Sequence, residues 1–290
     1  MAPAADLGAL RSHAVGVAYR MLGSRTEAED LAQEALLRWD EVRRREPVDN
    51  DEALLTTITT RLAIDHLRSA RVQREQYLGP WLPEPVAVDP LAEPGRAAEL
   101  ADSLSFALLV VLERLSPLER AAFLLHDVFG YDHRDVARAL DRSEAACRQL
   151  VSRARQAVEA ARPRRTVTPE EHRALLERFL AASRAGDVGA LEALLAEDVV
   201  LVSDGGPQRK AARHPIVGRD RVLRFLRRVG PRTFSDDIRL GTLNGEPAVL
   251  VRRDGELYSA GTIAVVDGRV VAVHLVLNPD KLRWVEPPLA

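Results

Sequence analysis

The stretch from Ser116 to Arg155 reads SPLERAAFLLHDVFGYDHRDVARALDRSEAACRQLVSRAR. Capping signals divide it into three predicted helices, which begin at Ser116, Asp132 and Ser143. Glu119 completes a capping box with Ser116, and apolar residues recur at helical spacing behind each cap. Only the short turn beginning at Asp141 separates the second helix from the third. Two short helices joined by such a tight turn are typical of a helix-turn-helix unit.

The third predicted helix carries polar side chains suited to reading DNA. Arg and Gln are the residue types that recognise guanine and adenine edges in the major groove. Its polar residues include Arg148, Gln149, Ser152, Arg153 and Arg155. An ordinary helical hairpin with a solvated arginine face is the alternative that this pattern leaves open.

Composition limits the class of protein. The chain has 290 residues, of which 46% are hydrophobic and 29% charged, so it is long enough for two or three globular domains. A net charge of −2 excludes a uniformly polybasic binder, and any contact with nucleic acid must come from local patches. The single cysteine, Cys147, excludes an internal disulfide and favours a reducing cytoplasm. We expect a cytoplasmic protein without a signal peptide and without a membrane segment.

The N-terminal part, from about Asp6 to Tyr77, is predicted to hold three helices. The second begins at a predicted capping box of Thr26 and Glu29 and is rich in acidic residues. The third, from about Ala53 to Arg74, is rich in arginine and could lie on DNA phosphates, although a solvated arginine face is the plainer alternative. Its arginines are Arg61, Arg68, Arg71 and Arg74.

A proline-rich stretch, residues 76–96, follows and reads QYLGPWLPEPVAVDPLAEPGR. Five prolines remove amide donors and fix φ, so we expect an extended linker. Trp81 and Leu82 would be costly to leave in water and are expected to pack on a neighbouring domain. A further helix is predicted from Leu100 to Leu115.

The C-terminal part is predicted to be an α+β unit. Helices are expected over residues 169–185, 188–195 and 219–229, with a strand over residues 199–203. From about Ile238 the apolar period changes to two, and three turn pairs divide the pattern into a four-stranded antiparallel meander. The pairs are Asn244-Gly245, Asp254-Gly255 and Asp267-Gly268.

The order of these segments resembles the extracytoplasmic-function (ECF) RNA polymerase sigma factors. The resemblance rests on EAEDLAQEALLRW at residues 27–39, TTRLAIDHLRSARVQRE at residues 59–75, and the helix-turn-helix ending in SRAR at residue 155. It implies a region 2 domain that binds core RNA polymerase and the −10 promoter element, and a region 4 domain that reads the −35 element. The implied partners are promoter DNA, the β′ clamp helices and the β flap of the polymerase.

The resemblance assigns residues to each implied role. The face for the β′ clamp helices comprises Asp30, Gln33, Glu34, Leu37 and Arg38. The −10 contacts are Asn50, Arg61, Asp65, Arg68, Arg71 and Arg74. The −35 contacts are Ser143, Glu144, Arg148, Gln149, Ser152, Arg153 and Arg155.

Three further segments resemble sigma factors with a fused SnoaL-like domain of the NTF2-like fold, the SigJ type. They are WLPEP at residues 81–85, SDGG at residues 203–206 and NPDKL at residues 278–282. The resemblance implies a conical C-terminal domain that acts as a built-in regulator. We hypothesise that residues 81–85 pack against this domain near the other two segments, although both loops could simply turn the chain. The candidate regulatory residues are Trp81, Leu82, Pro83, Asp204, Gly205, Gly206, Asn278, Pro279, Asp280 and Lys281.

The resulting prediction is a multidomain protein with two all-α sigma domains and a C-terminal α+β cone. The expected boundaries are 1–76 for region 2, 77–98 for the linker, 99–163 for region 4 and 167–290 for the SnoaL-like domain. A helix-turn-helix regulator with a ligand-sensing domain is the alternative. An NTF2-like enzyme would need Asp204 with His214 or His274, but the apolar strand around His274 favours a core histidine. We therefore assign no catalytic residue, no metal and no cofactor, and leave open a small ligand in the cone.

Overall fold

The computed structural model describes residues 6–75, 77–87, 105–161, 167–234 and 237–285, with side chains of 70–75 and 161 left out. The chain divides into two compact units. The helical unit comprises Met1–Glu75 with Val88–Arg162, and the sheet unit comprises Gln76–Ala87 with Pro163–Ala290. The predicted helix over residues 100–115 is shorter in the described part, where it spans Phe106–Leu112, and residues 88–104 lie outside the description.

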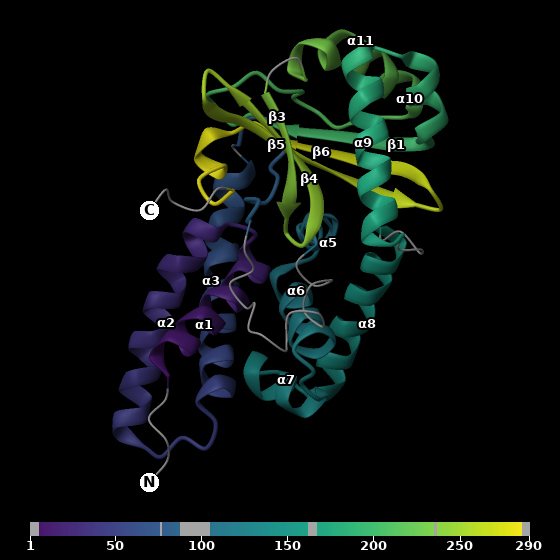
Figure 1. Cartoon of the computed structure of the whole chain (residues 1–290). Coiled ribbons are helices and arrows are strands. Elements are labelled where there is room, and N and C mark those ends of the chain that lie inside the picture. Colours follow the sequence, from purple (N-terminus) through teal and green to yellow (C-terminus); the bar gives the residue numbers. More distant parts are fainter. Residues whose placement is uncertain (1–5, 76, 88–104, 162–166, 235–236, 286–290) are drawn as a thin grey trace. The chain divides into compact units, whose positions relative to one another are not determined.

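The first half of the helical unit consists of three helices that pack side by side (Figure 1). They are α1 (Leu7–Leu22), α2 (Arg25–Arg45) and α3 (Asp51–Glu75). The predicted capping box at Thr26 is wrong, because Ser24 caps α2 and accepts a hydrogen bond from the amide of Glu27 at 3.1 Å. Gly23 ends α1 in the left-handed conformation, with φ of 68°. The chain therefore turns at Gly23, and the next residue, Ser24, is the cap of α2.

The second half of the helical unit confirms the predicted helix-turn-helix. Helices α5 (Phe106–Leu112) and α6 (Pro117–Phe123) lead through a π-helical turn (Leu124–Val128) to α7 (His133–Leu140) and α8 (Glu144–Ala161). Ser116 and Glu119 form the predicted capping box, and Asp132 caps α7. Asp141 ends α7 with φ of 52°, so the chain turns directly into α8. Cys147, Leu150, Val151 and Ala154 form the buried side of α8.

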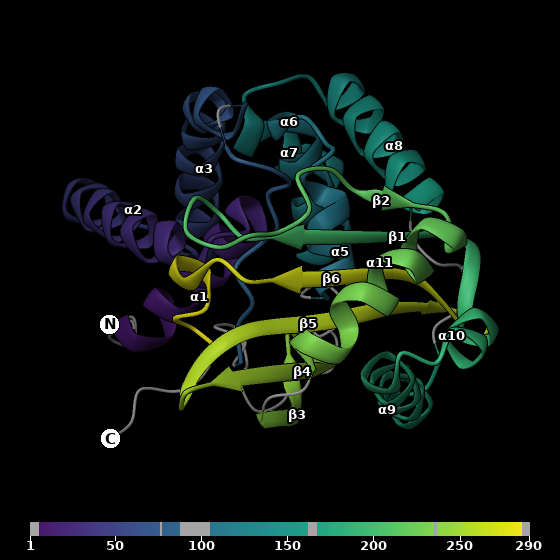
Figure 2. The same ribbon diagram turned by 90° about the horizontal axis from the view of Figure 1, so that it is seen from above.

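The sheet unit has the predicted α+β organisation. Its helices are α9 (Pro169–Ala185), α10 (Val188–Leu194), α11 (Arg219–Thr233) and the short 3₁₀ turn η2 (Pro279–Lys281). Its strands are β1 (Leu195–Asp204), β2 (Ile216–Val217), β3 (Asp237–Leu243), β4 (Glu246–Arg253), β5 (Glu256–Val266) and β6 (Arg269–Val276). The strand order is β2-β1-β6-β5-β4-β3, and α11 lies across the sheet (Figure 2).

The meander β3–β6 is antiparallel, as the three turn pairs predicted. Asn244, Asp254 and Asp267 and the glycine after each have positive φ, which is the backbone of a two-residue hairpin turn. The pairing of β1 parallel to β6 was not predicted, because no local signal marks a pairing across about 70 residues. It places the end of β1 beside the end of β6, at Asp204 and Val276.

Among the described helices, none is both long enough and apolar enough to cross a membrane.

Candidate DNA-binding helices and linker-binding site

The linker segment, which we define as residues 77–87, packs within the sheet unit. Its apolar residues are buried: Leu82 is 1% exposed and Val86 2%. Pro83 and Pro85 are also buried, and their rings hold the chain extended without needing amide partners. The linker segment is therefore packed against the C-terminal domain, close to the two predicted regulatory loops at residues 203–206 and 278–282.

Asp204 is the centre of this contact. It ends β1 and is 1% exposed. Its Oδ1 accepts hydrogen bonds from the Tyr77 hydroxyl at 2.6 Å and from the amide of Gly206 at 3.0 Å. Its Oδ2 accepts from the amide of Leu82 at 2.9 Å and from Nζ of Lys281 at 2.7 Å. Two of these four donors belong to the linker segment, so the carboxylate binds linker and domain together.

Lys281 provides the opposite charge. Its Nζ donates to the carbonyl of Leu82 at 2.5 Å as well as to Asp204, and its side chain is 7% exposed. The same ammonium lies 3.9 Å from the ring centroid of Trp81 and 4.9 Å from that of Tyr77. Aromatic faces attract a cation most strongly where water is excluded. Lys281 is thus enclosed by one carboxylate, one carbonyl and two rings, three of which come from the linker segment.

The two glycines after Asp204 are needed for close packing. A Cβ on Gly205 would lie 2.2 Å from the carbonyl oxygen of Arg209. Gly206 has φ of 56°, and a Cβ there would lie 2.6 Å from Nδ2 of Asn278. Asn278 fills that space, donates to the Tyr77 hydroxyl at 2.9 Å and caps η2. The sequence Asp204-Gly205-Gly206 therefore brings the β1 loop against the β6 loop beneath the linker.

Burial and the neighbouring Asp204 carboxylate raise the pKa of the Tyr77 phenol above its usual range. The phenol therefore stays protonated and keeps donating its hydrogen bond to Asp204.

A second attachment of the linker was missed by the sequence analysis. The amide of Val86 donates to Oδ1 of Asn244 at 3.1 Å, and the amide of Asn244 donates to the carbonyl of Val86 at 2.8 Å. The amide of Ala87 also donates to the carbonyl of Trp284 at 3.1 Å. Asn244 was interpreted only as a turn residue, and its second role carries no local signal. Tyr77 likewise carries no sequence signal beyond its place at the start of the linker.

Two of the predicted regulatory residues have other partners. Asp280 is exposed on η2 and accepts hydrogen bonds from Gln208 and Arg283, while Pro279 begins the turn. Neither hydrogen-bonds the linker segment. They serve to shape η2, which places Lys281.

In the helical unit, the five residues predicted to bind polymerase share one exposed face of α2. Asp30, Gln33, Glu34, Leu37 and Arg38 are all exposed, whereas Leu31, Ala35 and Trp39 on the other face are buried. Leu37 is 62% exposed, so this face carries one large apolar side chain among polar and charged ones. Glu34 and Arg38 form an ion pair at 2.5 Å.

The residues predicted to contact the −10 element differ in their hydrogen-bond partners. Asn50 caps α3 through the amide of Ala53 at 2.9 Å. Asp65 and Arg68 are exposed and pair at 3.3 Å. Arg61 donates from Nε to the carbonyl of Ala139 at 2.7 Å and from Nη2 to the carbonyl of Arg138 at 2.8 Å, both at the end of α7. Arg71 and Arg74 lie in α3, but their side chains fall outside the description.

The residues predicted to contact the −35 element lie on the exposed side of α8. Ser143 caps the helix through the amide of Ala146 at 3.2 Å, and Glu144 pairs with Arg148 at 2.7 Å. Gln149 and Ser152 are exposed. Arg153 lies 3.3 Å from Glu119, and Arg155 donates from Nε to Asp127 at 2.8 Å. These last two pairs join α8 to α6 and the π-helical turn, so both arginines also support the fold.

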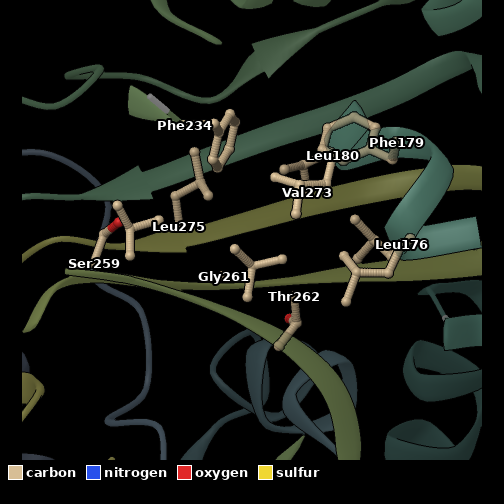
Figure 3. Close-up of a pocket in the computed structure, with 12 residues that line it drawn as sticks. Leu176, Phe179, Leu180, Phe234, Ser259, Gly261, Thr262, Val273 and Leu275 are labelled. Atoms are coloured by element: carbon tan, nitrogen blue, oxygen red, sulfur yellow. The ribbon is translucent and has the colours of Figure 1, made fainter. Parts of the chain in front are cut away.

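A small cavity lies between α9 and the sheet (Figure 3). It encloses about 20 Å³, which is room for roughly one water molecule. Its walls are apolar, from residues such as Phe179, Phe234 and Val273, with hydroxyls only from Ser259 and Thr262. Neither Asp204 nor either candidate histidine lines it. His274 follows Val273 on β6 and therefore faces the other side of the sheet.

The described residues contain no group of three or more His, Cys, Asp or Glu side chains arranged to hold a metal ion. The recorded hydrogen-bond partners of Asp204 include no histidine. His214, the other histidine considered, is exposed.

Comparisons with known proteins match the same three parts of the chain. Family profiles described as Sigma-70 region 2, Sigma-70 region 4 and SnoaL-like domain match residues 8–72, 105–158 and 176–279. The chain is 41% identical to the ECF RNA polymerase sigma factor SigJ of Mycobacterium tuberculosis strain H37Rv, over 95% of this chain and 92% of that protein. It is 32% identical to the same organism's "Probable ECF RNA polymerase sigma factor SigI", over 94% and 92%.

A solved structure has the same fold over nearly the whole chain. The crystal structure of Mycobacterium tuberculosis extracytoplasmic function sigma factor SigJ matches with a TM-score of 0.78 and 38% identity, covering 98% of this chain and 99% of that one.

Proposed function

This chain belongs to the ECF family of RNA polymerase sigma factors, and from that premise we propose which of its surfaces carry out promoter recognition. The exposed face of α2, with Leu37 at its centre, docks on the β′ clamp helices of core polymerase. An apolar side chain surrounded by charged ones is the usual composition of a protein-binding surface. The helices from Phe106 onward provide the surface for the β flap.

Promoter elements are bound by the two arginine-bearing helices. Helix α3, with Asn50, Arg61, Asp65, Arg68, Arg71 and Arg74, holds the −10 element. Helix α8, with Ser143, Glu144, Arg148, Gln149, Ser152, Arg153 and Arg155, enters the major groove at the −35 element. The exposure of Arg148, Gln149 and Ser152 supports this assignment.

The SnoaL-like domain regulates this activity by holding the linker. The observation that carries this proposal is the buried Asp204 carboxylate, which accepts hydrogen bonds from Tyr77 and Leu82 of the linker and from Lys281 of the domain. Helix α3 ends at Glu75, two residues before Tyr77. The domain therefore restrains the chain where it leaves α3, and so limits the separations that α3 and α8 can adopt on a promoter.

A series of promoters with different spacer lengths between the −10 and −35 elements tests this role. Transcription by core polymerase and the wild-type chain should show a sharp optimum of spacer length. The Asp204→Ala chain should show a broader profile with a maximum lowered several-fold, because the linker loses the attachment nearest to α3 and keeps only the one at Val86. Asp198→Ala, an exposed change on the same strand, is the matched control.

Both variants must still bind core polymerase, which complex formation measures. Both must also keep the structure of the helical unit, which circular dichroism measures. An Asp204→Ala profile identical to that of the control in width and height would contradict the proposed role of the linker contact.

Two alternative functions, a helix-turn-helix regulator and an enzyme, can be distinguished from a sigma factor. A helix-turn-helix regulator would shift duplex DNA in a gel without core polymerase, whereas a sigma factor requires core. An enzyme would need an acid and a base around a pocket, and the apolar walls of the cavity between α9 and the sheet supply neither. The activity that we propose for this chain is promoter recognition in the cytoplasm, without catalysis and without a cofactor. A small ligand inside the cone would have to widen this cavity to bind.

A further inference from the structure

Helix α11 of the sheet unit presents a row of arginines to solvent. Its sequence, RDRVLRFLRRVGPRT, contains six arginines and one acidic residue, Asp220. At 100° per residue, four of the arginines lie within about a quarter of the helix circumference and a fifth flanks them. These five residues, which we call the arginine row, are all exposed: Arg221, Arg224, Arg227, Arg228 and Arg232.

Other helices of the chain pair their arginines with acids one turn away. Examples are Arg38 with Glu34 on α2, Arg148 with Glu144 on α8, and Arg173 with Glu177 on α9. Helix α11 differs. Arg219, which is outside the row, lies 3.8 Å from Glu197.

Among the described residues, no hydrogen bond or ion pair is recorded for four members of the row, from Arg221 to Arg228. Like charges three and four residues apart repel one another on a helix. The helix is held nevertheless, because Val222, Leu223 and Leu226 on its other side are buried in the core of the sheet unit. These four arginines thus concentrate positive charge on a surface for which the described residues show no counter-charge.

The composition of the row favours a polyanion over a protein surface. Among the described residues, none of the large exposed apolar side chains lies on α11, so the row lacks the apolar centre of a typical protein interface. A guanidinium binds a phosphate through two parallel hydrogen bonds. From Arg221 to Arg232 the helix rises about 17 Å, enough to follow two or three successive phosphates of one DNA strand.

We infer that the arginine row of α11 contacts the phosphate backbone of duplex DNA when the chain is bound at a promoter. The contact is independent of sequence and adds a third DNA-binding surface to α3 and α8. It rests on the membership of the chain in the sigma-factor family, and it does not depend on the linker contact proposed above.

The test measures binding of the holoenzyme, formed from core polymerase and the full chain, to a labelled promoter duplex over a range of salt concentrations. The variant R221Q/R224Q/R228Q removes three members of the row. The matched control R173Q/R178Q/R184Q removes three exposed arginines from α9 of the same unit. Each neutralised phosphate contributes about 0.9 to the slope of log affinity against log salt.

The expected result for the α11 variant is a slope reduced by about 2 to 3 and an affinity at low salt lowered by at least about tenfold. The same loss should occur on a duplex without −10 and −35 elements, because phosphate contacts carry no sequence information. The control should keep the wild-type slope.

Three outcomes overturn the inference. One is an unchanged slope with unchanged affinity for core polymerase. Another is an unchanged slope with weakened core binding, which would place the row against an acidic polymerase surface. The third is an equal loss in the α9 control, which would show a general effect of net charge. A linker variant such as Asp204→Ala should change the spacer-length profile and leave the salt slope intact, so the two proposals fail separately.

Discussion

In each of the two units, one cationic side chain donates hydrogen bonds to backbone carbonyls far away in the sequence. The cation is Arg61 in the helical unit and Lys281 in the sheet unit. In the helical unit, the guanidinium of Arg61 donates to the carbonyls of Arg138 and Ala139, and the residue is exposed. In the sheet unit, the ammonium of Lys281 donates to the carbonyl of Leu82, but the residue is buried and paired with the Asp204 carboxylate. Both bonds join a helix or turn to backbone far away in the sequence.

The two contacts differ in whether another acceptor can replace the one that each cation binds. Water or a phosphate can reach Arg61, and a phosphate is a stronger acceptor than a carbonyl, so its contact with α7 can be exchanged for DNA. Lys281 and Asp204 are both removed from water, and separating them would leave a buried charge without compensation. We therefore expect the contact between α3 and α7 to be reversible and the linker contact to be permanent. The following variants test this comparison.

The largest effect is expected for Lys281→Met. It keeps much of the side-chain volume but leaves the Asp204 carboxylate buried without its cation, which should cost about 3–5 kcal/mol of unfolding free energy. Urea unfolding measures the loss. Lys210→Met, at the other lysine of the chain, changes an exposed residue and should stay within about 0.5 kcal/mol of wild type.

The double variant Asp204→Asn with Lys281→Met sharpens this test, because it removes both charges. It should unfold at a higher urea concentration than Lys281→Met alone. A single variant as stable as the Lys210→Met control would show that the pair is not desolvated.

A smaller effect is expected for Gly206→Ala, compared with Gly130→Ala in the helical unit. Both glycines have positive φ, and a side chain there should cost about 1–2 kcal/mol in either unit. Only at Gly206 would the new Cβ also strike a neighbour, Asn278, whereas nothing lies within 4 Å at Gly130. Thermal unfolding should therefore place Gly206→Ala below Gly130→Ala, and equal melting temperatures would refute the close packing of the two loops.

Arg61→Ala should release the end of α7. Hydrogen bonds to a charged group contribute about 1.5–3 kcal/mol, so amide hydrogens near Asp141 and Arg142 should exchange about tenfold faster or more. Hydrogen–deuterium exchange of the full chain measures this. Arg68→Ala removes an arginine from the same helix whose recorded partner is the nearby Asp65, and should leave α7 unchanged. Equal exchange in the two variants would argue against the Arg61 contact.

The smallest effect concerns pH. The half-buried ring of His172 donates from Nε2 to the carbonyl of Ile263 at 2.8 Å, and burial lowers the pKa of His172. The unfolded chain, with a histidine pKa of about 6.5, then binds more protons below that pH, so stability falls as pH falls until the lowered folded pKa is reached.

The melting temperature of the wild type should therefore drop by about 1–3 °C more than that of His172→Gln between pH 7.5 and pH 5.5. His214→Gln, at an exposed histidine, should follow the wild type. A His172→Gln chain with the full wild-type pH dependence would rule out this histidine as its source.

The sequence by itself determined the features that depend on neighbouring residues. The caps at Ser116 and Asp132 and the turn at Asn244-Gly245 were predicted correctly, because a cap or a two-residue turn is fixed by a few adjacent backbone groups. The cap of α2 was misplaced by two residues because two residues that can cap a helix, Ser24 and Thr26, lie close together at its start. The order of the helices was enough to indicate the family.

Only the tertiary structure decided which distant groups meet. It joins Tyr77, Asp204 and Lys281, pairs Asn244 with Val86, and leaves the arginines of α11 together on an exposed face. Such pairings depend on how strands and loops far apart in the sequence pack, and the free energy of a buried charge exists only once packing has removed the water around it.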